Sequence, residues 1–174
     1  MNKWVKRLLP ASQIGGGLVG LSMVTQVLRH VEQTTGSLIV HMAFCAVFAF
    51  GIAAGILLIT KPRLGLYLSL IFQFIQIPIL TTSAVAYRMF SGATFHAYVG
   101  QEKFGTYLHF GAGYSFWLKP ADSWMVGINF VALFFFIYLI RQLWLPAPVV
   151  QDSQIEEPQC APAEVEGRLN WRTS

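Results

Sequence analysis

Four long stretches without a charged residue constrain the fold of this chain more than any other feature. They cover residues 8–28, 40–60, 64–87 and 124–140. Each has about the 17–25 residues that a helix needs to cross a bilayer. The sequence therefore predicts an all-α integral membrane protein with four transmembrane helices in an up-down bundle.

Composition supports this class and places the domain boundaries. Hydrophobic residues make up 55% of the chain and charged residues 11%, whereas a soluble domain has about 25% charged residues. We expect a transmembrane domain at 1–145, with spans at 8–28, 38–60, 64–87 and 124–143 and an outer loop at 88–123. The acidic, proline-rich remainder, 146–174, has the composition of a disordered cytoplasmic tail.

Lysine and arginine residues near the span ends predict the orientation. With the N-terminus inside, six of them lie on the inner side and four on the outer side, and the short turn 61–63 carries two of the inner ones. We expect a protein of the plasma membrane, the inner membrane of a bacterium, with both termini cytoplasmic and residues 88–123 external. Basic residues at span ends meet anionic headgroups, so the positive charge of the body does not indicate nucleic-acid binding.

Polar residues within the spans are candidates for ligand contacts, because a polar group in hydrocarbon needs a partner. At 3.6 residues per turn, one face of the third span gathers five of them: Ser69, Gln73, Gln76, Ser83 and Tyr87. Two interpretations stay open, namely hydrogen bonds that hold the bundle together and a small polar cavity for a ligand. The candidate ligand-binding residues are Gln73, Gln76, His41 and Asn129.

The sequence contains no recognisable catalytic or metal-binding motif. It has no His-Glu-x-x-His, no Gly-x-Ser-x-Gly, no phosphate loop, and no acidic residue within any span. Cys45 falls in the second span and Cys160 in the tail, so we expect no disulfide between them. We therefore expect no enzyme activity, no catalytic residue, no metal site and no cofactor.

The outer loop is unusually aromatic, with nine aromatic residues between positions 88 and 123. Residues 106–110 and 114–118 are two aromatic runs around the glycine-rich segment 111–113, a pattern typical of a short β-hairpin. An interfacial helix is the alternative. The loop is either a cap over the bundle or a recognition surface, and its candidate partner-binding residues are Tyr107, Tyr114, Phe116 and Trp117.

Three functions are compatible with these patterns. The first is a non-catalytic accessory, assembly or interaction subunit. The second is a binder or carrier of a small lipophilic ligand such as a quinone, a lipid or haem. The third is an oligomeric solute channel or exporter. The expected partners are the lipid bilayer and either another membrane protein or a second copy of the chain.

Overall fold

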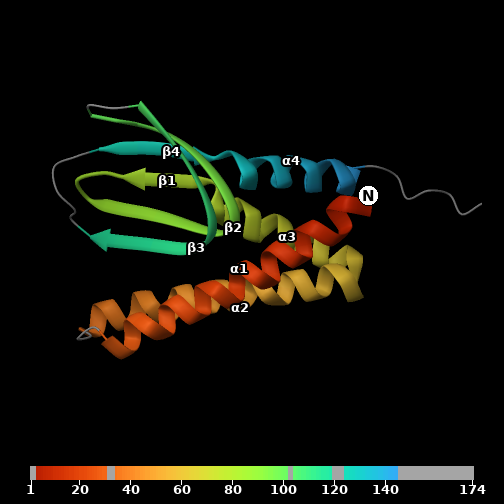
Figure 1. The fold of residues 1–174 in the computed structure, drawn as a ribbon, viewed down its shortest axis with the longest axis horizontal. Helices are drawn as coiled ribbons and strands as arrows, with labels where there is room; N and C mark the ends of the chain where they lie inside the picture. The colour runs from red at the N-terminus through yellow and green to blue at the C-terminus, as the bar shows by residue number, and fades with distance from the viewer. Residues whose placement is uncertain (1–2, 31–33, 102–103, 119–123, 145–174) are drawn as a thin grey trace, which may run out of the picture.

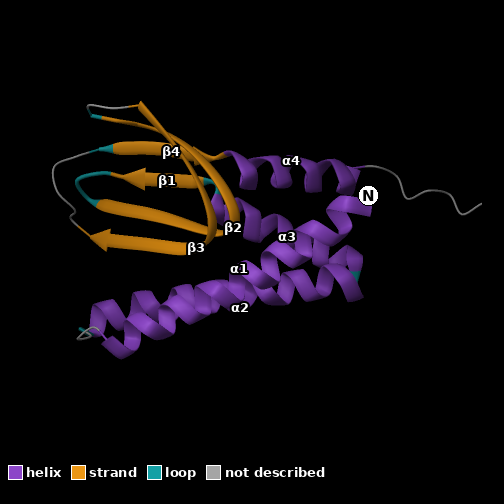
Figure 2. Ribbon diagram, viewed as in Figure 1, coloured by secondary structure: helices purple, strands orange, loops and turns teal. Residues whose placement is uncertain are grey.

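The computed structural model describes residues 3–30, 34–101, 104–118 and 124–144. Its elements follow in the order α1 (Lys3–His30), α2 (Thr35–Thr60), α3 (Pro62–Gln76), β1 (Pro78–Thr81), β2 (Val85–Gly100), β3 (Phe104–Leu118), β4 (Met125–Asn129) and α4 (Phe130–Trp144) (Figure 1). Figure 2 shows α1 and α2 side by side along the molecule, with the sheet over one half of their length and α3 and α4 over the other half. The expected tail, 146–174, lies outside the described residues.

Helices α1 and α2 form an antiparallel pair. They have 28 and 26 residues, which corresponds to roughly 40 Å each at 1.5 Å per residue. Thr34 caps α2, because its side chain accepts a hydrogen bond from the N–H of Ser37 at 3.3 Å. Both helices are long and apolar enough to cross a membrane.

The prediction of four transmembrane helices is wrong, because the third and fourth apolar stretches each combine a short helix with a strand. The stretch 64–87 contains most of α3, then β1 and the start of β2. Pro78 cannot continue α3, since it has no backbone N–H and its ring would clash with the preceding turn. Thr82 then closes a tight turn, in which its hydroxyl accepts hydrogen bonds from the N–H groups of Ala84 and Val85.

The fourth stretch, 124–143, begins as a strand and becomes a helix only at Phe130. The side-chain oxygen of Asn129 accepts hydrogen bonds from the N–H groups of Val131 and Ala132, at 3.2 and 3.3 Å. This is the geometry of a helix N-cap. Asn129 therefore marks the point where β4 ends and α4 begins.

The four strands form an antiparallel sheet in the order β1-β4-β2-β3, with an additional pairing between β1 and β2. Strand β1 pairs with residues 86–88 of β2 and, on its other edge, with β4. Strand β4 in turn pairs with residues 96–100 of β2. The two ends of β2 and the strands β1 and β4 thus close a loop of pairings that we call the strand ring.

Closing the strand ring requires β2 to bend between its two paired ends. The bend contains Gly92, whose φ of +89° is a conformation that L side chains rarely adopt. A Cβ atom at this position would also collide with Ser12 of α1. Figure 1 shows both long strands, β2 and β3, curving strongly.

The expected hairpin around residues 111–113 is also wrong. Strand β3 runs without interruption from Phe104 to Leu118, and it pairs with β2 from Val99↔Phe104 to Val85↔Leu118. The segment 88–123 therefore contributes most of two long strands, rather than a loop with a short hairpin or an interfacial helix. The register with β2 continues through Gly111 and Gly113 without a break, so these glycines do not form a turn.

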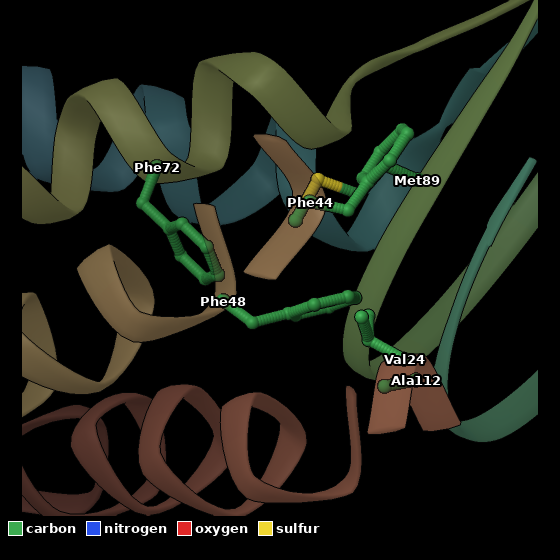
Figure 3. Packing of buried hydrophobic residues seen from close by; sticks show 6 residues of the cluster. All are labelled: Val24, Phe44, Phe48, Phe72, Met89 and Ala112. Atoms are coloured by element: carbon green, nitrogen blue, oxygen red, sulfur yellow. The ribbon is translucent and has the colours of Figure 1, made fainter. Parts of the chain in front are cut away.

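The sheet is fixed to the helices by a shared hydrophobic core. Its buried residues come from α1, α2, α3, β2 and β3, and they are Val24, Phe44, Phe48, Phe72, Met89 and Ala112 (Figure 3). A second cluster joins α1 and α2 to α4 through Leu9, Leu58, Phe135 and Leu139. Helices and sheet are therefore packed as one body.

Candidate functional site

An apolar pocket of about 620 Å³ lies where α1 and α2 meet β3. We call it the helix–strand pocket. It is lined by Met23, Val27, Gly36, Ser37, Val40, His41, Tyr114, Ser115, Phe116, Trp117 and Leu118. Four residues predicted from the sequence for two separate roles, His41, Tyr114, Phe116 and Trp117, thus line one pocket.

His41 presents a defined hydrogen-bonding state in the helix–strand pocket. Its Nδ1 lies 2.5 Å from the carbonyl oxygen of Ser37. A carbonyl oxygen can only accept, so Nδ1 donates to it, and the Ser37 hydroxyl lies 3.3 Å from the same nitrogen. In the neutral ring with this tautomer, Nε2 is an acceptor. The ring also meets the ring of Tyr114 edge-on, with 5.8 Å between centroids.

Tyr114 supplies the complementary group, a hydroxyl that can donate. Its ring packs against Phe44 and Phe48, with centroid distances of 4.5 and 6.1 Å. The hydroxyl oxygen is buried and has no hydrogen-bond partner within the part of the chain that the structure describes. Burial raises the pKa of Tyr114, so the hydroxyl stays protonated. An unpaired buried donor costs about 1–3 kcal/mol, and a ligand with an acceptor atom would recover that energy.

A second apolar pocket of about 460 Å³ adjoins the first on α2 and shares Val40 and Phe116 with it. Its wall includes Tyr87, whose hydroxyl donates to the carbonyl of Ile75 at 2.8 Å. Burial raises the pKa of Tyr87 to about 12, which keeps this donor protonated. The hydroxyl is therefore occupied in holding β2 to the end of α3, and the wall of this pocket is otherwise apolar.

The other predicted ligand residues do not line either of these pockets. Gln76 accepts a hydrogen bond from the N–H of Ser91 at 2.8 Å, at the bend of β2 where neither β1 nor β4 pairs with it. Gln73 is buried on the same face of α3, and Asn129 caps α4. Gln76 and Asn129 thus hold the fold together at the places where strands and helices meet.

Tyr107 lies apart from the three other predicted partner residues. It lines a third pocket of about 290 Å³ at the strand ring, together with Arg88, His96 and Tyr98. We call it the ring pocket. The last three residues were not among the candidate site residues predicted from the sequence. These three residues are separated by even numbers of positions along β2. In a strand, this spacing places side chains on the same face.

A buried polar contact in the helical part was also missed. The hydroxyl of Ser69 in α3 donates to the side-chain oxygen of Gln13 in α1 at 3.1 Å. Gln13 is only 1% exposed. It lies in the first apolar stretch and is the residue of α1 to which the polar face of α3 is hydrogen-bonded.

No known protein family, curated protein sequence or solved structure matches this chain.

Proposed function

We propose that this protein is a non-catalytic membrane protein that binds a small lipophilic molecule in the helix–strand pocket. The observation that carries the proposal is that one apolar pocket is lined both by His41 and by Tyr114, whose buried hydroxyl has no hydrogen-bond partner among the described residues. Ligand sites are typically apolar clefts with a few polar groups that fix orientation. A quinone fits the tyrosine, because its carbonyl oxygen accepts from the hydroxyl of Tyr114. Its reduced form, a quinol, has hydroxyl groups that also donate to Nε2 of His41.

The proposal includes a membrane orientation. Helices α1 and α2 cross the bilayer, and the basic turn at 61–63 and both termini lie in the cytoplasm. The helix–strand pocket then opens near the external ends of α1 and α2, where Val27, Gly36 and Ser37 line it. In a variant without Cys45 and Cys160, a cysteine at Gly36 should be labelled by an impermeant reagent from outside intact cells. Labelling only after the cells are opened would reverse the orientation.

The test of binding uses the full chain purified in detergent. An absorption spectrum and an organic extract reveal a bound haem or quinone, and titration with a short-chain quinone is followed by the fluorescence of Trp117 and the other tryptophans. We expect Tyr114→Phe to weaken quinone binding about three- to tenfold, since it removes one hydrogen bond of about 1 kcal/mol. Tyr67→Phe, on an exposed residue of α3, is the matched control. No saturable binding, or equal affinity in both variants, would refute the proposal.

A second candidate function, an accessory subunit of another membrane protein, is favoured by the outer face of β3. Phe104, Leu108 and Phe110 occupy alternate positions and are 72%, 60% and 73% exposed. Replacing all three by serine should abolish association with a partner while quinone binding is retained. Loss of both properties would indicate a damaged fold instead.

A further inference from the structure

The ring pocket has a chemistry opposite to that of the helix–strand pocket. It is lined by Ile79, Arg88, Phe90, His96, Tyr98, Thr106, Tyr107 and Met125. Arg88, His96 and Tyr98 stand on one face of β2, at even-numbered positions, and the register places Tyr107 directly opposite His96. One guanidinium, one imidazole and three hydroxyl groups therefore converge on a space of about 290 Å³.

No carboxylate of the described residues neutralises this pocket. The eight aspartate and glutamate residues all fall in 31–33, 102–103, 119–123 or 145–174, outside the part of the chain that the structure describes. The Arg88 guanidinium lies over the ring of Phe90, with 5.9 Å from Cζ to the ring centroid. The described residues that line the pocket thus include one positive charge and several hydrogen-bond donors.

His96 is the most enclosed polar group of this pocket, with 2% of its surface exposed. Its Nε2 is hydrogen-bonded to the hydroxyl of Thr94, which is itself fully buried. Burial, the charge of Arg88 and the neighbouring His109 lower the pKa of His96 to about 4, so the ring is neutral at neutral pH. The structure gives Nδ1 no partner within the described residues, which leaves it available to a bound group.

Small residues keep the space open beside these donors. Tyr98 pairs across the strands with Gly105 on one side and with Gly127 on the other. A Cβ atom on Gly105 would overlap the phenol ring of Tyr98, and one on Gly127 would lie 2.8 Å from the Tyr98 Cβ. The tyrosine can lie along the wall of the pocket because neither neighbour has a side chain.

We propose that the ring pocket binds a phosphate-type oxyanion, with Arg88 as the charged contact and the hydroxyl of Tyr98 as a further donor. The Tyr107 hydroxyl lies 3.2 Å from Nδ1 of His109 and is hydrogen-bonded to it. A guanidinium binds phosphate oxygens through two parallel hydrogen bonds, and hydroxyl groups satisfy the remaining oxygens. The phosphate group belongs either to a free anion or to a lipid headgroup. Both sources offer the same chemistry to the pocket.

The test compares Arg88→Gln with Arg63→Gln in the full chain purified in a neutral detergent. Arg63 is also exposed, but it lies at the start of α3 and does not line the pocket. Inorganic phosphate is titrated by calorimetry, and phosphatidylglycerol is titrated separately by native mass spectrometry. We expect saturable binding of at least one probe to the wild type and to Arg63→Gln, with at least tenfold weaker binding to Arg88→Gln.

The two probes distinguish the sources of the phosphate. Binding of inorganic phosphate indicates a free anion, whereas binding of phosphatidylglycerol alone indicates a headgroup site. Absence of saturable binding of both probes to the wild type overturns the proposal, as does equal affinity in Arg88→Gln.

Two further sets of variants keep the result decisive. If Arg88→Gln does not fold, the variant Tyr98→Phe removes only one hydroxyl and should weaken binding at least fivefold, and an unchanged affinity refutes the proposal. The variants Glu102→Gln and Asp122→Asn test for an internal carboxylate. If only these two variants bind a probe, an acid of this chain occupies the site and the proposal is wrong.

Discussion

The helix pair α1–α2 and the strand ring are similar in apolar content but satisfy their backbones in different ways. Each helix forms its hydrogen bonds within its own segment. In the strand ring, Ile79 pairs with Arg88 on one side and with Gly127 on the other, so its partners lie far apart in the sequence. The helix pair can therefore be predicted from one segment at a time, whereas the ring depends on segments meeting in space.

The two regions also differ in where they place polar side chains. In the ring, Thr94, His96 and Asn129 are buried, while large apolar residues are exposed on the opposite strand faces, among them Phe95, Val99, Val126 and Ile128. A sheet in water shows the reverse alternation, with the apolar face inside. The ring thus buries polar groups beside the apolar side chains of Ile79 and Phe90, and it exposes apolar side chains on its outer surface.

The largest expected effect comes from the bend that closes the ring. Gly92→Val introduces a β-branched side chain at φ +89° and against Ser12 of α1. Backbone strain and overpacking each cost about 1–3 kcal/mol, so we expect the free energy of unfolding to fall by about 2–5 kcal/mol. Denaturation in detergent, followed by circular dichroism, measures this change.

Gly15→Val is the matched control for the bend. A Cβ atom at Gly15 of α1 would meet no atom within 4 Å, and we expect a change below about 1 kcal/mol, because valine and glycine are both modest helix formers. Equal destabilisation by the two variants would mean that position 92 is not a special bend.

A smaller effect should follow from Gln76→Leu. This change removes the acceptor of the Ser91 N–H and leaves a buried donor unpaired, at a cost of about 1–3 kcal/mol. Gln73→Leu, less than one helical turn away, is the control, because the structure shows no hydrogen bond from Gln73 to another described residue. We expect Gln73→Leu to be nearly neutral, and the order of the two melting temperatures in detergent measures the difference. Equal losses would contradict the link between α3 and β2.

The smallest effect is expected at the junction of β4 and α4. Asn129→Ala removes the cap that accepts from Val131 and Ala132, and the loss of an N-cap costs about 0.5–2 kcal/mol. Asn129→Ser retains a capping oxygen and should recover most of the melting temperature. If serine is no better than alanine, the helix does not begin at this residue.

The sequence was sufficient for the helix pair and insufficient for the ring. Hydropathy alone finds α1 and α2, but it treats 64–87 and 124–143 as equivalent to them. The local signals of the strands are Pro78, the Thr-Thr-Ser run at 81–83 and the capping residue Asn129. Proline, serine and threonine are tolerated in membrane helices as well, so the pairing of β1 with the neighbouring β2 and the distant β4 decides between the interpretations.

The candidate site was predictable in part for the same reason. His41, Tyr114, Phe116 and Trp117 were identified by residue type, but their meeting in one pocket depends on β3 packing against α1 and α2. Arg88 and His96 were missed because 88–123 was interpreted as a loop. An even spacing between two residues predicts that they share a face only if the segment is a strand. In a loop, the same spacing predicts nothing about where the side chains lie.

The most direct test of the strand ring is a set of amide proton contacts around Leu80, measured by solid-state NMR on the protein in lipid bilayers. The account predicts cross-strand contacts from Leu80 to Tyr87 on one side and to Val126 on the other, following the pairing register. Helical contacts between residues three and four apart throughout 77–87, without contacts to 126, would contradict it.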